Sequence, residues 1–187
     1  MNNIISELKQ SVPPQLLSGL ATRVGESEAG VAKALGGIFP ALLGGILNKT
    51  SDPAAPGTLD QLMGLLKTTP SVDSLTSQPQ ALLNPTDEHS GLGGIAGQFV
   101  STFLGDKTTA VTALIAKISG LKNTSASSLL QLAAPLVLGT LGKKVSEGNL
   151  SADGLASYLA TQKSNIMAAA PVGLSGALGL ADGLDQG

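Results

Sequence analysis

Hydrophobic residues recur along this chain at intervals of three and four positions, the spacing that places them on one face of an α-helix. Val, Ile, Tyr and Phe never gather in the alternating runs that indicate β-strands. The two most apolar stretches, 31–49 and 126–144, each contain a proline, Pro40 and Pro135. The pattern therefore predicts an all-α fold, a multi-helix bundle whose central helices are interrupted by proline.

Helix start and stop signals divide the first half of the chain. Pro13 and Pro14 precede a predicted helix over 15–24, and Gly25 follows its end. Ser27 is a typical N-cap for the next helix, which Pro40 is expected to kink or restart. Beyond a loop at 51–57, the run Thr58-Leu-Asp-Gln resembles a capping box and predicts a short helix as far as Lys67.

The second half shows the same order of signals. Asp106 is the expected cap of a helix that runs to Ile118, and Gly120 lies just past its end. Ser125 is the expected cap of the next helix, which contains Pro135, and Ser151 caps a helix over 152–162. The two halves therefore look like copies of one helical unit.

Matching residues at a constant offset support this duplication. Pro40 matches Pro135 and Gly44 matches Gly139, and the same offset relates Leu35 to Leu130 and Lys49 to Lys144. We therefore predict one all-helical domain over 1–187, built from two pseudo-repeated units at about 11–84 and 105–180. The polar segment 84–90 is the expected connection, and 182–187 is expected to be a flexible acidic tail.

Composition excludes several classes of protein. The chain has 187 residues, 42% of them hydrophobic and 13% charged, which is enough apolar material for a real core. Its net charge is −2 and Arg23 is its single arginine, so we expect no nucleic-acid partner. It has no cysteine, which removes disulfides and thiolate chemistry. The N-terminal residues lack the pattern of a signal peptide, so a cytoplasmic location is expected for the chain as given.

Glycine is unusually frequent, with 24 residues, and needs a physical reason. Gly37, Ala41 and Gly45 fall four apart, a spacing that makes a flat helix face and lets another backbone approach closely. Membrane helices use the same device. The uncharged run 123–142 is long enough to span a membrane but contains polar residues, and the run 34–47 is too short. Buried core helices are the favoured interpretation, and membrane association is the alternative.

Candidate chemistry is scarce. His89 is the only histidine, and its acidic neighbours Asp87 and Glu88 lack the spacing that places two metal ligands on one helix face. No Gly-x-Ser-x-Gly nucleophile motif is present. The glycines over 91–97 follow no predicted strand, so a phosphate-binding loop is not expected. Lys143 and Lys144 are explained by the preference of cations for a helix C-terminus.

We therefore predict no enzyme activity, no catalytic residues, no cofactor and no metal. The residues singled out are structural, namely Pro40, Pro135, Gly37, Gly45 and Gly139. The predicted function is a non-enzymatic helical module for protein interaction or structure, with a protein partner or self-association as its mode of action. The alternative is a membrane-associated or membrane-active helical protein. The sequence identifies no small-molecule ligand.

These segments resemble the bacterial YidB-like family, also called domain of unknown function 937. The likeness extends from about Ser11 to Gly179 and rests on the segments 25–27, 39–45, 119–120 and 134–139, with 162–163 and 170–174 following. It implies an all-helical bacterial domain with no established activity, present here as two tandem copies of the family's helical unit. It also implies a similarity to the N-terminal region of OmpA-family fusion proteins, and hence a link to the cell envelope. No peptidoglycan-binding domain follows before Gly187, so that binding function is not transferred to this chain.

Overall fold

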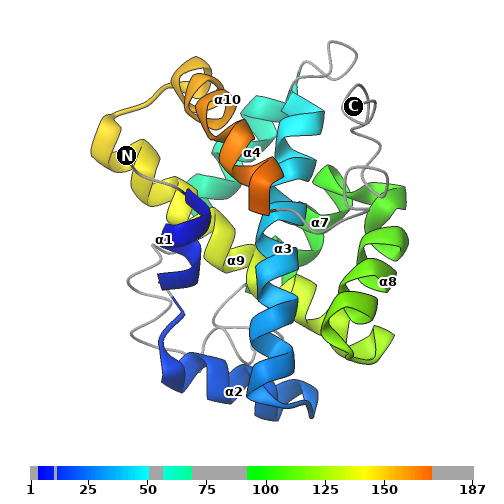
Figure 1. Ribbon diagram of the computed structural model, residues 1–187. Coiled ribbons are helices and arrows are strands. Elements are labelled where there is room, and N and C mark those ends of the chain that lie inside the picture. Colours follow the sequence, from blue (N-terminus) through cyan, green and yellow to red (C-terminus); the bar gives the residue numbers. More distant parts are fainter. Residues whose placement is uncertain (1–3, 11, 51–56, 69–91, 170–187) are drawn as a thin grey trace.

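Two long helices, α3 (Glu28–Thr50) and α9 (Asn123–Gly148), pack against each other at the centre of the molecule (Figure 1). The computed structural model describes residues 4–10, 12–50, 57–68 and 92–169. The shorter helices around the central pair are α1 (Ile4–Gln10), α2 (Pro14–Val24), α4 (Thr58–Thr68), α7 (Leu92–Phe103), α8 (Thr108–Ser119) and α10 (Ala152–Ala169), with a 3₁₀ turn at Gly105–Lys107. The described part of the chain has no strand, which confirms the all-α prediction.

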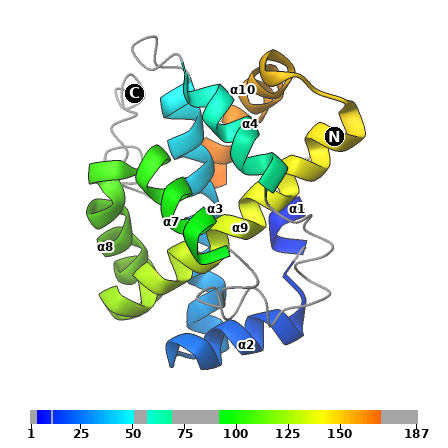
Figure 2. The same cartoon turned by 180° about the vertical axis from the view of Figure 1, so that it is seen from behind.

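The shorter helices cover the central pair on several sides. Helices α2, α7 and α8 pack against both central helices, α10 packs mainly against α3, and α4 packs mainly against α9. Figure 2 shows α4 and α7 in front of α3, on the face that Figure 1 hides. In both views α8 lies on the opposite side of the molecule from α1. Each central helix is thus enclosed by elements from both halves of the chain.

The prolines do not interrupt the central helices. Both α3 and α9 continue as single helices through Pro40 and Pro135, so a break or restart of the helix at either proline is wrong, and a kink there stays a prediction. A proline inside a helix removes one backbone hydrogen bond at a cost of about 3 kcal/mol. Both prolines are buried among apolar neighbours, and burial of the surrounding side chains offsets that cost.

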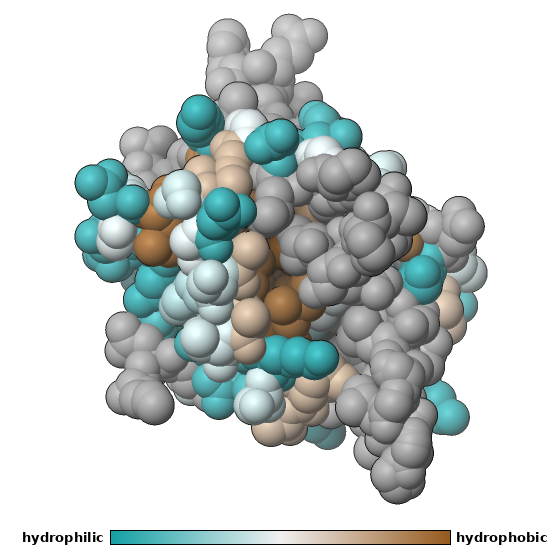
Figure 3. Space-filling model, turned by 90° about the horizontal axis from the view of Figure 1, so that it is seen from above, coloured by the Kyte–Doolittle hydropathy of each residue, from teal (hydrophilic) through white to brown (hydrophobic). Residues whose placement is uncertain are grey.

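The core surrounds these central helices. Phe39, Phe99 and Phe103 are among its largest fully buried side chains, and the rings of Phe99 and Phe103 meet edge to face with centroids 5.2 Å apart. Among the described residues, Ile118 is the one large hydrophobic residue whose side chain is exposed. Figure 3, which looks down on the α10 and α4 side, accordingly shows hydrophilic residues around small hydrophobic areas.

Two of the described helices, α3 over Glu28–Leu47 and α9, are long and apolar enough to cross a membrane. The first of these exceeds the run 34–47 that the sequence marked as too short, because the helix begins at Glu28. Within the molecule, 83% and 78% of the two apolar windows are buried. Core packing therefore accounts for their apolar character.

Some of the predicted helix caps are present. The hydroxyl oxygen of Ser27 accepts a hydrogen bond from the Gly30 N–H at 3.1 Å, and Ser151 accepts one from the Gly154 N–H at 3.2 Å. Gly25 and Gly120 both adopt the left-handed conformation that ends a helix, with φ of 74° and 76°.

Other predicted caps are wrong. Ser125 lies inside α9, which begins at Asn123, and its hydroxyl instead donates to the carbonyl of Val24 at 3.2 Å. Asp106 lies in the 3₁₀ turn, and α8 begins after it at Thr108. Helix α10 also continues to Ala169, beyond the predicted end at 162. The predicted connection at 84–90 and the tail at 182–187 lie outside the described residues.

Candidate functional site

Conventional catalytic groups are scarce in the described part of the chain. Its acidic and histidine side chains form no group of three that could hold a metal ion. His89 and its acidic neighbours lie outside the described residues. Gly93, Gly94 and Gly97 of the 91–97 motif lie in α7, a helix that follows no strand among the described elements, and Gly91 lies outside the described residues. Charged and polar side chains with specific partners, and a groove, lie around α1 instead.

Helix α1 is held in place by apolar and polar contacts. Ile4 and Leu8 are fully buried, and the helix packs against α3, α9 and α10. The side-chain oxygen of Gln162 on α10 accepts hydrogen bonds from the Ile4 N–H at 3.1 Å and from the Asn165 amide at 3.0 Å. These contacts fix α1 against three longer helices.

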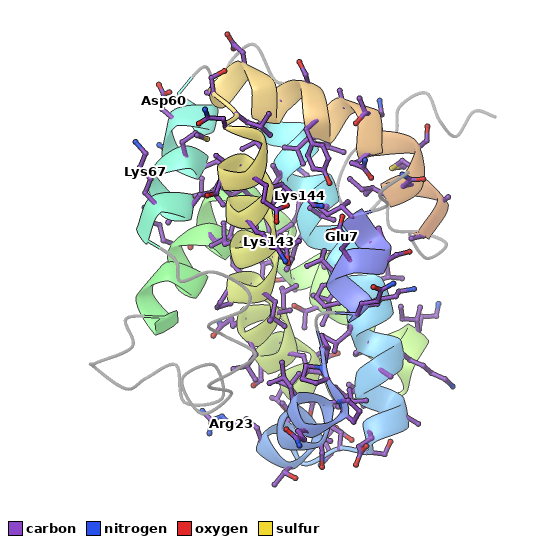
Figure 4. The ribbon with its side chains drawn as sticks, turned by 90° about the vertical axis from the view of Figure 1, so that its left-hand side faces the viewer. Glu7, Arg23, Asp60, Lys67, Lys143 and Lys144 are labelled. Carbon is purple, nitrogen blue, oxygen red and sulfur yellow. The ribbon has the colours of Figure 1, made fainter. Side chains whose placement is uncertain are left out.

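One side of α1 carries an ion pair. Lys144 Nζ of α9 lies 2.7 Å from Glu7 Oε1, and the two side chains are 13% and 31% exposed respectively. Figure 4 shows Glu7 and Lys144 facing each other between α1 and α9, with Arg23 far away at the end of α2. Because α9 extends to Gly148, Lys144 lies a turn before the helix end, and Glu7 is its electrostatic partner.

Tyr158 of α10 lies in the field of this pair. Burial, with a smaller contribution from the negative charge of Glu7, raises the pKa of the Tyr158 hydroxyl to about 12. The phenol is therefore protonated at neutral pH and cannot act as a general base. Its hydroxyl and Glu7 Oε2 are buried and have no hydrogen-bond partner among the described residues. The arrangement ties α1 to the bundle.

A groove of about 430 Å³ lies on another side of α1, where α1, α2 and α3 meet. Its described lining combines apolar side chains with two cations and contains no acidic residue: Lys9, Val12, Leu17, Ala32, Lys33, Leu35, Gly36 and Phe39. Leu35 and Phe39 are buried, Val12 and Leu17 are half-buried, and both lysines are exposed. The groove therefore has an apolar interior beneath a positively charged rim.

Gly36 helps to shape this groove. It lies inside α3, and a Cβ atom placed on it would meet no atom within 4 Å. Gly45 on the same helix is different, because a Cβ there would lie 2.8 Å from Leu104 Cδ2 and 3.1 Å from the Phe103 carbonyl oxygen. The two glycines thus have opposite surroundings.

The structural residues singled out from the sequence are divided between the two central helices. Pro40, Gly37 and Gly45 lie on α3, and Pro135 and Gly139 lie on α9. All five are buried, but they form no common site.

The groove residues Lys9, Lys33 and Gly36 were not anticipated. The sequence signal that could have indicated the groove is Lys33, a charged residue in a mainly apolar helix, three positions before Gly36. The tertiary arrangement was needed to bring Lys9 beside it.

Comparison with known proteins gives one match. No curated protein and no solved structure matches this chain significantly. A family model described as "Bacterial protein of unknown function (DUF937)" matches residues 6–144. That span includes most of α1, both lysines of the groove rim and most of α9. The chain therefore belongs to the DUF937 family of bacterial proteins.

Proposed function

We propose that this chain is a non-enzymatic helical binding module and that its binding surface is the groove between α1, α2 and α3. The observation that carries the proposal is the combination of a concave apolar interior with two lysines on its rim. Pockets of this kind, mostly apolar with a few placed polar groups, are typical ligand sites.

The construction of the groove supports a binding role. Its walls come from three helices, and α1 is fastened to α9 and α10 by the Glu7–Lys144 ion pair and by Gln162. A fastened wall loses little conformational freedom when a ligand binds, which favours affinity. The module thus presents a largely formed site. A link to the cell envelope rests on the family resemblance alone.

Nuclear magnetic resonance tests this proposal. Isotope-labelled protein is screened against a library of small apolar, anionic and cationic fragments, and shifted backbone resonances are mapped onto the structure. We expect at least one class of fragment to shift Val12, Leu17 and Gly36 together. Shifts confined to other surfaces, or no shifts with any fragment, would contradict a binding role for the groove.

Vesicle flotation tests the alternative, a membrane-associated protein. The two central helices are mostly buried in the molecule, so we expect the folded chain to stay with the soluble fraction. Flotation with neutral vesicles would instead support membrane association.

A further inference from the structure

We propose that the groove binds a small amphiphile that consists of one apolar chain and one anionic head group, a carboxylate or a phosphate. This inference rests on the proposed function and specifies the chemistry of its ligand. Four observations carry it, namely the size of the groove, the charge of its rim, its apolar interior and the glycine at position 36.

The size of the groove favours a small molecule. Its volume of about 430 Å³ lies within the range of roughly 300–1,000 Å³ that is usual for small-molecule sites. A folded partner would need a contact area of about 800 Å² on each side. The described lining consists of eight residues on three short stretches of chain, which is a small surface for such a partner.

The charge of the rim selects an anion. Lys9 is in the last turn of α1 and Lys33 is on α3, so the fold brings together two cations that are distant in sequence. Neither forms an ion pair with a described residue. The whole chain has a net charge of −2, so this local positive charge contrasts with the overall balance. Lysine is a frequent ligand of carboxylate and phosphate groups.

The interior of the groove selects an apolar chain. Val12 and Leu17 are half-buried walls, and Phe39 is fully buried beneath them. Their side chains offer no hydrogen-bonding group to a polar ligand. A ligand that satisfies both parts of the groove therefore places its head group at the lysines and its chain against Val12 and Leu17, over the buried Phe39.

Gly36 keeps the groove open. Glycine is a poor helix former, yet no neighbouring atom requires a glycine here, since a Cβ would meet nothing within 4 Å. Pro40, four residues after Gly36, does not require a glycine at position 36 either. In α9 the residue four positions before Pro135 is Gln131, so a helix with an internal proline accepts a larger residue at this position. A larger side chain at position 36 would instead occupy the space between Lys33 and Phe39. Access to the groove is the remaining physical reason for this glycine.

Isothermal titration calorimetry tests the proposal with three probes whose alkyl chains are nearly equal in length: decanoate, decyl phosphate and decyltrimethylammonium. Each is used below the concentration at which it forms micelles. We expect one of the two anions, or both, to bind at least tenfold more tightly than the cation. The difference should shrink as salt is added, because the lysines are exposed. Binding by decyl phosphate but not decanoate would identify a phosphate head group, and the reverse a carboxylate.

Charge reversal provides the matched variants. Lys33→Glu should weaken anion binding at least tenfold and should improve binding of decyltrimethylammonium. Lys117→Glu is the control, because Lys117 is exposed on α8, which contributes no residue to the described lining of the groove, and its substitution changes the net charge equally. It should leave the affinities unchanged. Equal effects of the two variants would overturn the assignment of the head group to this rim.

Closing the groove provides the second pair. Gly36→Leu should abolish binding, whereas Gly64→Leu, at an exposed position of α4 that is also open, should preserve it. Tight binding by Gly36→Leu would overturn the proposed site. Failure of all three probes, while library fragments still shift the groove resonances, would overturn the amphiphile inference but leave the groove as a binding site. Failure of the probes and of the fragments would overturn both.

Discussion

Gly45 of α3 lies directly against the backbone of Phe103 at the end of α7. A Cβ atom at Gly45 would be 3.1 Å from the carbonyl oxygen of Phe103, closer than ordinary van der Waals contact. The absence of a side chain thus lets two helices approach each other more closely than any larger residue would allow.

Substitution Gly45→Leu tests this contact. The larger side chain must displace the Phe103 backbone or adopt a strained rotamer, which typically costs about 1–3 kcal/mol. We expect a lower denaturant midpoint with an unchanged m-value. A midpoint that falls only at low protein concentration would place the contact between chains. A higher midpoint would show that position 45 has room for a side chain.

Substitution Gly36→Leu should have the opposite effect on stability. No atom lies within 4 Å of a Cβ at this position, and leucine is a better helix former than glycine by about 0.5–1 kcal/mol. We expect the denaturant midpoint to rise slightly. A clear fall would mean that the groove closes around position 36 in solution, contrary to the structure.

These two glycines show what the sequence could and could not predict. Both lie in α3 and both look like small residues inside an apolar helix. The fold class, the left-handed glycines at positions 25 and 120 and the caps at Ser27 and Ser151 depend on local signals, and sequence reasoning found them. The four-residue spacing of Gly37, Ala41 and Gly45 predicted the close approach of another backbone, which Gly45 makes with Phe103. The identity of that partner and the open surroundings of Gly36 depend on distant helices and have no local signal.

The predictions that were wrong also depend on contacts with distant parts of the chain. Ser125 has the sequence signature of a cap, but its hydroxyl bonds to Val24 of another helix. Pro40 and Pro135 have the signature of a helix break, yet buried neighbours keep both helices intact. Of the candidate groove, only the residues of α3 were prominent in the sequence. Lys9 joins them because α1 folds back across the bundle.

The Glu7–Lys144 pair should contribute measurably to the docking of α1. We expect a double-mutant cycle with Glu7→Gln and Lys144→Met to give a coupling free energy of about 0.5–1 kcal/mol, because both side chains are partly exposed. Urea unfolding of the four proteins measures it. A coupling of zero within error would show that α1 is held by its apolar contacts alone.

Tyr158 should make stability decrease at high pH. Burial raises its pKa from 10.0 in the unfolded chain to about 12 in the folded protein, so the folded state retains the proton more strongly. This contribution is fully present below pH 10 and is lost as the pH rises toward 12. Tyr158 is the only tyrosine, so ultraviolet absorbance of tyrosinate follows its titration without interference.

Two variants check the causes of this shift. Glu7→Gln should lower the pKa of Tyr158, because the negative charge of Glu7 contributes to raising it. Tyr158→Phe should weaken the loss of stability between pH 10 and 12. A titration of the wild-type tyrosine at its ordinary pKa would contradict the burial of its hydroxyl.

The two halves should superpose. Ser125 of α9 bonds to the carbonyl of Val24, and the matching position in the first half, Gly30, faces the carbonyl of Ser119 with a Cβ distance of 3.7 Å. Such an exchange of equivalent contacts is typical of two-fold symmetry. In a crystal structure we expect the segments 14–50 and 109–145 to superpose with Pro40 on Pro135. Failure to superpose would reject the duplication.

The most direct test of the binding role compares wild-type protein with Gly36→Leu in the same fragment screen. The substitution fills the groove without disturbing a packed contact, so loss of binding cannot be attributed to unfolding if the midpoint rises as expected. We expect fragments to shift the resonances of Val12 and Leu17 in the wild-type protein and these shifts to disappear in the variant. Identical shifts in both proteins would contradict the claim that this groove is the binding site.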